Sequence, residues 1–323
     1  MQKATARAHP NIAFIKYWGN RDDDLRLPSN PSLSMNLAGA HTETTVEWVD
    51  GLTADDLEIN GQPATEDASQ RVSAHLDRIR KRLGIDVHAH VASENNFPMG
   101  AGIASSAAAF AALTVAAVAA AGETLTEREL TTIARMGSGS ASRSVPTGFV
   151  EWFAADTHEE SYAQSFAGPD HWNLCDVIAV ISREHKKTVS QAGHRTAMTS
   201  DLQPARVAGA QARFDICRQA LVERDFATLA TVVEEDSNLM HAVMMTSRPP
   251  LFYWLPGSLT VMQLVPEWRQ QGLNVCYTLD AGPNVHCICT ADAADEVRSR
   301  LQALSEVVDV RMTTPGGPAE VIR

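Results

Sequence analysis

The sequence lacks several features that mark large classes of proteins. Its 323 residues contain no stretch of about 18 uninterrupted apolar residues, and the N-terminal stretch has no apolar segment typical of a secretory leader. Only five cysteines occur, none in a Cys-x-x-Cys pair, so neither a disulfide framework nor a zinc site is indicated. We therefore expect a cytoplasmic protein whose thiols are buried. These thiols belong to Cys175, Cys217, Cys276, Cys287 and Cys289.

Positive charge is also scarce. The chain has 27 Lys plus Arg against 39 Asp plus Glu, a formal net charge of −12. Because an acidic surface repels phosphate backbones and anionic lipids, this balance argues against nucleic acid or a membrane as partner. With 44% hydrophobic and 20% charged residues, the composition is that of an ordinary globular protein with ample material for a core.

Hydrophobic periodicity predicts a mixture of strands and helices, with more helix in the second half. Strands are expected at 41–49, 56–60, 87–93, 148–153, 176–182, 273–279, 284–290 and 306–311. Helices are expected at 67–83, 103–121, 126–136, 199–222, 225–241, 258–272 and 292–304. Thr126 and Glu129 predict a capping box. Residues 19–32 and the Gly/Ser-rich 137–144 are interpreted as loops, and the polar stretch 155–175 as a boundary.

One junction has the properties of an anion site. The string SENNFPMGAGIASSAA (93–108) leads from a predicted strand into an Ala-rich helix. Glycines let a backbone approach phosphate oxygens, and the first N–H groups of a helix favour negative charge. Ser105 and Ser106 add hydroxyls for phosphate or magnesium. No GxxxxGK[ST] string is present, so this is not a Walker-type loop. A tight structural turn would explain the glycines equally well.

The longer string PMGAGIASSAAAFAAL (98–113) resembles the PxxxGLxSSA phosphate loop of the GHMP superfamily of small-molecule kinases, with Ile103 in place of Leu. Further strings resemble the mevalonate diphosphate decarboxylase subfamily of that superfamily: NIAFIKYWGNRD (11–22), GSGSASRS (137–144) and LDAGPN (279–284).

This resemblance spans nearly the whole chain and implies an α+β, GHMP-kinase-like fold of two lobes. Residues 1–175 would form an N-terminal, ribosomal-S5-like lobe that binds the nucleotide. Residues 176–323 would form a C-terminal, ferredoxin-like α/β lobe. The resemblance also implies ATP and Mg²⁺ as cofactors and is compatible with a homodimer.

The subfamily's reaction explains which residue types are needed. The enzyme phosphorylates the 3-hydroxyl of a mevalonate phosphate with ATP and then eliminates phosphate and CO2, which leaves an alkene. This chemistry requires a group that orients or deprotonates the hydroxyl, cations for the transferring phosphoryl, and a clamp for the carboxylate.

The resemblance implies three catalytic residues. Asp280 would be the partner of the hydroxyl, although an Asp at this position also suits a cap of the AGPN turn. Lys16 would supply positive charge close to Asp280; its alternative interpretation is a solvent-facing strand lysine. The planar fork of Arg143 suits the substrate carboxylate. Stabilising that carboxylate in the ground state would slow the loss of CO2, so the role of Arg143 is mainly orienting.

Other site residues follow from the same strings. Substrate-binding candidates are Tyr17, Trp18, Asn20, Ser138, Ser140, Ser190, Gln191 and His194. Candidates for the base or ribose are Ser93, Asn95 and Asn96. Candidates for the ATP phosphates are Pro98, Gly100, Gly102, Ser105 and Ser106, of which Ser105 and Ser106 also qualify for Mg²⁺.

Two positions depart from the subfamily pattern. Members that act on the diphosphate usually carry YWGK, where this chain has Asn20, and many bacterial members carry Arg where it has Gln191. A charge-assisted phosphate contact in a closed site contributes about 1.5–3 kcal/mol. The loss of two such cations predicts mevalonate 5-phosphate as the substrate and isopentenyl phosphate as the product. His194, which replaces a Met, or Arg195 is an alternative source of positive charge.

Three other functions remain open at this stage. The first is a conventional decarboxylase of mevalonate 5-diphosphate. The second is a kinase that stops at the 3-phospho product, which the joint presence of Asp280, Lys16 and Arg143 disfavours. The third is a non-catalytic nucleotide-binding or regulatory protein, which the same charged residues disfavour.

Overall fold

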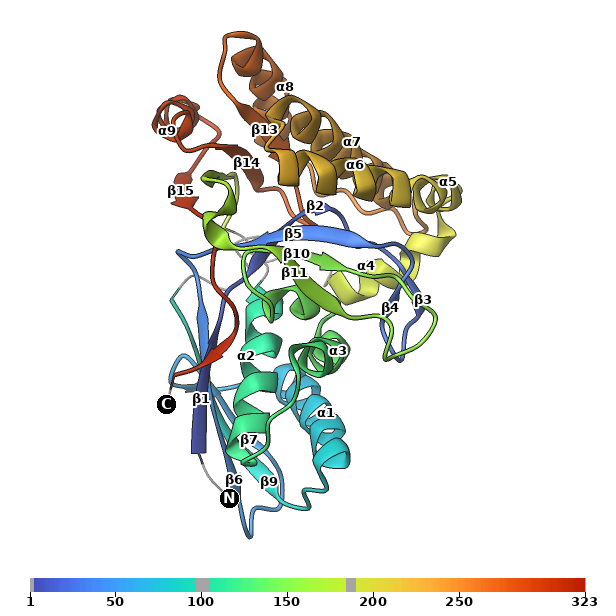
Figure 1. Ribbon diagram of the computed structural model, residues 1–323, viewed down its shortest axis with the longest axis vertical. Coiled ribbons are helices and arrows are strands. Elements are labelled where there is room, and N and C mark those ends of the chain that lie inside the picture. The colour runs from blue at the N-terminus through green and yellow to red at the C-terminus, as the bar shows by residue number, and fades with distance from the viewer. Residues whose placement is uncertain (1–2, 97–104, 184–189, 323) are drawn as a thin grey trace.

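The computed structural model (Figure 1) describes residues 3–96, 105–183 and 190–322. Its largest sheet has the order β16-β1-β6-β9-β7-β8, and its pairs are antiparallel except β7 with β9. The strand β6 alternates buried and half-buried residues along its length, as expected for a sheet with one face on the core. The strands are β1 Lys3–Ala8, β6 Thr42–Val49, β7 Asp56–Ile59, β8 Gln62–Pro63, β9 His88–Asn95 and β16 Glu320–Val321.

Three helices lie on one side of this sheet: α1 (Glu66–Leu83), α2 (Ser105–Ala120) and α3 (Glu127–Gly137). The Ala-rich helix α2 packs directly against β1 and β6, and its small side chains are buried almost all round. The predicted capping box is confirmed, because the Thr126 hydroxyl accepts from the N–H of Glu129 and the Glu129 carboxylate accepts from that of Thr126.

Two four-stranded sheets form the rest of the β structure. The first has the order β11-β10-β5-β2 and the second β13-β14-β12-β15. Helices α6 and α7 pack between them, and α8 and α9 cover the other face of the second sheet. The strands are β2 Asn11–Ile15, β5 Ser32–Asn36, β10 Phe149–Trp152, β11 Ala163–Ala167, β12 Leu174–Val180, β13 Val275–Thr278, β14 Val285–Thr290 and β15 Asp309–Thr313. The longer helices are α6 Ala210–Glu223, α7 Phe226–Thr246, α8 Pro256–Gln270 and α9 Ala294–Gln302.

The structure corrects the helix predicted over 199–222. It begins with a short 3-10 turn, η3 (Ala197–Thr199), and α5 (Gln203–Ala208) is separated from α6 by Gly209. A Cβ at residue 209 would lie 2.7 Å from Nη1 of Arg213. The glycine therefore lets a guanidinium pass close to the backbone, which continuous periodicity does not reveal.

Two predicted loops are also more ordered than expected. Residues Gly139–Ser144 form a 3-10 helix, η1, and most of its residues are buried. Within 19–32, β3 (Asn20–Asp22) pairs with β4 (Leu27–Pro28) as a small hairpin. Both segments are held by contacts with distant parts of the chain, which local composition does not encode.

The mixed helix-and-strand composition is confirmed, and so are the five buried thiols. The division between residues 175 and 176 stays a prediction; that point falls inside β12, and β11 and the 3-10 turn η2 (Pro169–His171) lie within the polar stretch before it. In the described ranges, no helix is long and apolar enough to cross a membrane.

Candidate active site

Lys16 and Asp280 meet although they are 264 positions apart in the chain. Lys16 follows β2 and Asp280 follows β13, and the Lys16 Nζ lies 2.8 Å from Oδ1 of Asp280. The Lys16 side chain is only 1% exposed, whereas that of Asp280 is 27% exposed. Burial lowers the pKa of Lys16, and the neighbouring carboxylate of Asp280 opposes that shift. The expected proximity of the two residues is thus confirmed, and the carboxylate remains accessible from outside.

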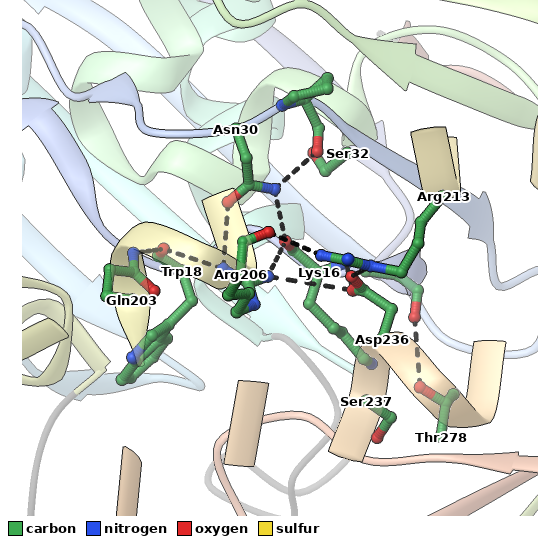
Figure 2. A network of polar contacts seen from close by, with 12 residues as sticks. Lys16, Trp18, Asn30, Ser32, Gln203, Arg206, Arg213, Asp236, Ser237 and Thr278 are labelled. Carbon is green, nitrogen blue, oxygen red and sulfur yellow. Dashed lines mark hydrogen bonds and ion pairs between the residues drawn. The ribbon is translucent and has the colours of Figure 1, made fainter. Parts of the chain in front are cut away.

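A buried polar network surrounds the main chain of Lys16 (Figure 2). The Lys16 N–H donates to Oδ2 of Asp236 at 2.6 Å, and its C=O accepts from Nη2 of Arg206 at 2.7 Å and Nδ2 of Asn30 at 2.9 Å. Arg213 donates through Nε to Oδ1 of Asp236 at 2.8 Å. These groups were missed by sequence reasoning. The available signal was Asp236 itself, a charged residue within the buried stripe of a helix.

Arg143 lies in η1 and is buried. Its Nη1 donates to Oγ of Ser32 at 2.7 Å and its Nη2 to Oδ1 of Asn11 at 3.2 Å. The buried Nε has no hydrogen-bond partner among the residues that the structure describes. Burial lowers the pKa of Arg143 to about 10, against the favourable charge of Asp280, so the guanidinium is charged at neutral pH. A buried cation with an unused donor fits an anionic ligand.

Three hydroxyls lie at hydrogen-bond distance, each from the next, and one of them belongs to the same 3-10 helix as Arg143. The Oγ atoms of Ser106 and Ser138 are 3.2 Å apart, and those of Ser138 and Ser140 are 3.4 Å apart. Ser106 belongs to the first turn of α2, Ser138 ends α3, and Ser140 lies in η1. The structure thus brings a residue predicted for the nucleotide next to two predicted for the substrate.

Aromatic rings pack around His194, which lies in the short helix α4 (Ser190–Thr196). The ring of Tyr17 stacks on it with centroids 4.1 Å apart, and that of Trp18 lies 4.5 Å away. Nδ1 of His194 accepts from the N–H of Gly19 at 3.1 Å. Burial lowers the pKa of His194 to about 3. The imidazole is therefore neutral at pH 7 in this structure, which argues against His194 as the source of the missing positive charge.

Asn20 is the next residue along this segment. Its Oδ1 accepts from the hydroxyl of Tyr17, and its Nδ2 donates to Oδ1 of Asp23 at 2.8 Å. Arg195 is exposed, with Nε 3.9 Å from the Asp23 carboxylate. The amide at position 20 thus bonds both Tyr17 and Asp23 and carries no charge.

Sequence reasoning also missed other arginines near this segment. Arg26 follows the turn of the β3–β4 hairpin with φ +50°, and the preceding Leu25 C=O accepts from Nε of Arg135 at 3.0 Å. Burial raises the pKa of Tyr17, and the Arg26 guanidinium is the strongest charge that opposes this rise. In the described part of the chain, no ion pair joins Arg26 to a carboxylate. A single arginine in a polar loop has no sequence signal that marks it as functional.

The predicted nucleotide residues are only partly described. Ser93 Oγ lies 3.0 Å from Oγ1 of Thr44, Asn95 accepts from Thr42, and Asn96 bonds the main chain at residues 39 and 41. Pro98, Gly100 and Gly102 lie outside the described residues. For Ser105, Ser190 and Gln191 the structure describes a backbone position in α2 or α4 and no side chain. The roles of these residues remain predictions.

Two family models match the chain. The diphosphomevalonate decarboxylase-like N-terminal domain matches residues 8–163, and the mevalonate 5-diphosphate decarboxylase C-terminal domain matches residues 176–315. A diphosphomevalonate decarboxylase from Candida albicans is 38% identical, covering 93% of this chain and 88% of the relative. A phosphomevalonate decarboxylase from Haloferax volcanii is 33% identical, covering 99% and 98%.

Solved structures agree with this result. The mevalonate diphosphate decarboxylase from Enterococcus faecalis has a TM-score of 0.92 and 32% identity, covering 100% of this chain and 99% of its own. A structure described as MDDEF in complex with MVAPP, AMPPCP and magnesium has a TM-score of 0.94, 32% identity and the same coverage. The predicted GHMP-kinase-like fold is confirmed by this similarity.

Proposed function

This chain belongs to the mevalonate diphosphate decarboxylase family of ATP-dependent lyases, and from that premise we propose that it converts mevalonate 5-phosphate to isopentenyl phosphate. The other products are ADP, phosphate and CO2. Decarboxylation of a mevalonate phosphate or diphosphate is common to the relatives; the monophosphate is our specific proposal.

The Lys16–Asp280 pair supports the first step. With Nζ of Lys16 on its Oδ1, the Asp280 carboxylate is oriented and still partly exposed. It would accept a hydrogen bond from the 3-hydroxyl and take its proton as the phosphoryl group arrives. The buried ammonium would offset the negative charge that develops there, where the low dielectric strengthens the interaction.

Arg143 and the three serines support binding of the acid. The unused Nε of Arg143 and the hydroxyls of Ser138 and Ser140 would hold the substrate carboxylate at a fixed angle to Asp280. Orientation matters more than affinity here, because a contact that stabilises the carboxylate must be given up as CO2 leaves.

ATP and magnesium fit the same place. The N-terminus of the 16-residue α2, with the Ser106 hydroxyl in its first turn, suits a triphosphate. Among the described side chains, no cluster of three or more His, Cys, Asp or Glu could hold a metal. Magnesium would therefore be held by phosphate oxygens with a serine hydroxyl of α2, and it would supply positive charge to the phosphates.

The neutral side chains beside Tyr17 support the monophosphate as the substrate. Asn20 occupies the place beside the phenol, and His194 is held neutral by burial. A second phosphate at this end would add negative charge without a matching cation from either residue, at a cost of about 1.5–3 kcal/mol per lost contact.

Mevalonate 5-diphosphate is the second candidate substrate, and Arg26 is the observation that favours it. The positive charge of its guanidinium opposes the rise in the pKa of Tyr17 that burial causes, and in the described ranges it pairs with no carboxylate. The Candida albicans relative is also named for the diphosphate.

Parallel assays of CO2 and ADP with the two substrates test the proposal. We expect a higher kcat/KM for the monophosphate, and Asn20→Lys should shift the ratio toward the diphosphate by roughly tenfold to a hundredfold. A strong preference of the unmodified enzyme for the diphosphate would refute the proposed substrate. ADP without CO2 would indicate a kinase that stops at the 3-phospho product.

A further inference from the structure

We propose that Asp236 and Ser237, neighbours on helix α7, are positioning residues that set the relative placement of Lys16 and Asp280. The helix holds the main chain of the Lys16 segment through Asp236 and that of the Asp280 segment through Ser237, with a longer bond from the Tyr277 N–H to Oε1 of Glu234. This inference rests on the proposed function, because it concerns the pair to which that function assigns the first step.

The first contact fixes Lys16. Oδ2 of Asp236 accepts from the Lys16 N–H at 2.6 Å, while Arg206 and Asn30 bind the C=O of the same residue. Both ends of this residue's main chain are therefore held by side chains. Figure 2 shows Asp236 lying between Lys16 and Arg213. Asp236 is fully buried, so its placement allows little movement.

The second contact fixes the strand end that carries Asp280. Oγ of Ser237 accepts from the N–H of Leu279 at 3.0 Å, one residue before Asp280. Ser237 is also fully buried. Asp236 and Ser237 are consecutive on one helix. The positions of the Lys16 segment and of the Asp280 segment are therefore both fixed relative to α7. A direct contact of Thr278 Oγ1 with the C=O of Ala13, at 3.5 Å, is longer and weaker than either.

Charge explains why a carboxylate occupies the first position. A buried Asp without cations would be costly, and here Arg213 lies 2.8 Å from Oδ1 and Arg206 lies 3.9 Å from Oδ2. The ionised Asp236 in turn gives a stronger hydrogen bond to the Lys16 N–H than a neutral acceptor would. If Asp236 served only to pair with Arg213 and Arg206, it would not need to contact the main chain of Lys16.

Steady-state kinetics of Ser237→Ala and Asp236→Asn test the proposal, with ADP release measured for both mevalonate phosphates. We expect kcat to fall about tenfold in Ser237→Ala and roughly a hundredfold in Asp236→Asn, with each KM within about twofold. Using both substrates separates the two questions, because a preference for the diphosphate overturns only the proposed substrate.

Matched controls lie on the same helix. Asn238→Ala removes a hydrogen bond to the Tyr277 hydroxyl. Glu234→Gln weakens the ion pair with Arg269 and keeps a side-chain oxygen that can accept from the Tyr277 N–H. Neither residue contacts Lys16 or Leu279. Both controls should lose thermal stability to a similar degree and keep kcat. If Ser237→Ala and the folded fraction of Asp236→Asn match these controls in kcat, the positioning role is refuted. Ser237→Ala decides the outcome if Asp236→Asn does not fold.

The pH dependence of kcat adds a readout that a purely structural role would not move. The ionisable groups that act on Lys16 are Asp280, Asp236, Arg143 and His241, with Arg206 on its C=O. Removing the negative charge of Asp236 disfavours the ammonium form of Lys16. If kcat requires that ammonium, the alkaline limb of log kcat should move to lower pH in Asp236→Asn. It should stay in place in Glu234→Gln. An unshifted limb in Asp236→Asn would contradict the proposal.

Discussion

Asp280 differs from the other carboxylates of the buried network in being partly exposed while paired with a buried lysine. A turn-capping aspartate would need neither property. Asp236, by contrast, is enclosed and bound by two arginines. The difference in environment therefore supports the proposal that Asp280 contacts the substrate and that Asp236 supports its partner Lys16.

Asp280→Asn should reduce turnover by about 10²- to 10⁴-fold, because an amide cannot accept the hydroxyl proton. Affinity for an ATP analogue, measured by calorimetry, should be unchanged, since the phosphate contacts are expected at α2. Turnover close to that of the unmodified enzyme would show that Asp280 is not the hydroxyl's partner.

Among the elements, η1 packs closely against Tyr17. A Cβ at residue 139 would lie 2.5 Å from Cε1 of Tyr17, so only glycine lets η1 approach this ring. Since η1 also carries Ser140 and Arg143, its position sets the distance between the expected carboxylate clamp and the aromatic wall.

Gly139→Ala should therefore raise KM for the mevalonate phosphate by about tenfold, with KM for ATP little changed. Gly168→Ala is the matched control, because a Cβ there meets no atom within 4 Å and the backbone φ is −71°. Kinetics with each substrate varied in turn decide the matter. An unchanged substrate KM in Gly139→Ala would mean that η1 adjusts without disturbing the site.

For the whole molecule, buried histidines make stability depend on pH. Burial lowers the pKa of His75, His194 and His241 to about 3, whereas an unfolded chain has histidines near pKa 6.5. Below that value the unfolded state binds protons that the folded state excludes. Stability from these groups is therefore complete above about pH 6.5 and is lost as the pH falls.

Three such residues predict a loss of about 6 kcal/mol in the free energy of unfolding between pH 8 and pH 5. Urea unfolding at the two pH values measures it. His90→Gln, at an exposed histidine, should leave the loss unchanged. Equal stability at both values would show that the buried histidines take up protons in the folded state.

The sequence by itself determined most helices and strands, because their apolar residues repeat at the period of one regular element. Its motif strings also identified the family and predicted Lys16, Asp280 and Arg143 as site residues. Both kinds of information are local, since each is carried by a short run of residues.

Only the tertiary structure decided which distant groups support that site. The break at Gly209, the burial of η1, the neutral state of His194 and the contacts of Asp236 with Lys16 all depend on segments far apart in the chain. Burial and charge at these positions arise from packing between elements. The periodicity of apolar residues along the chain does not show which elements pack together.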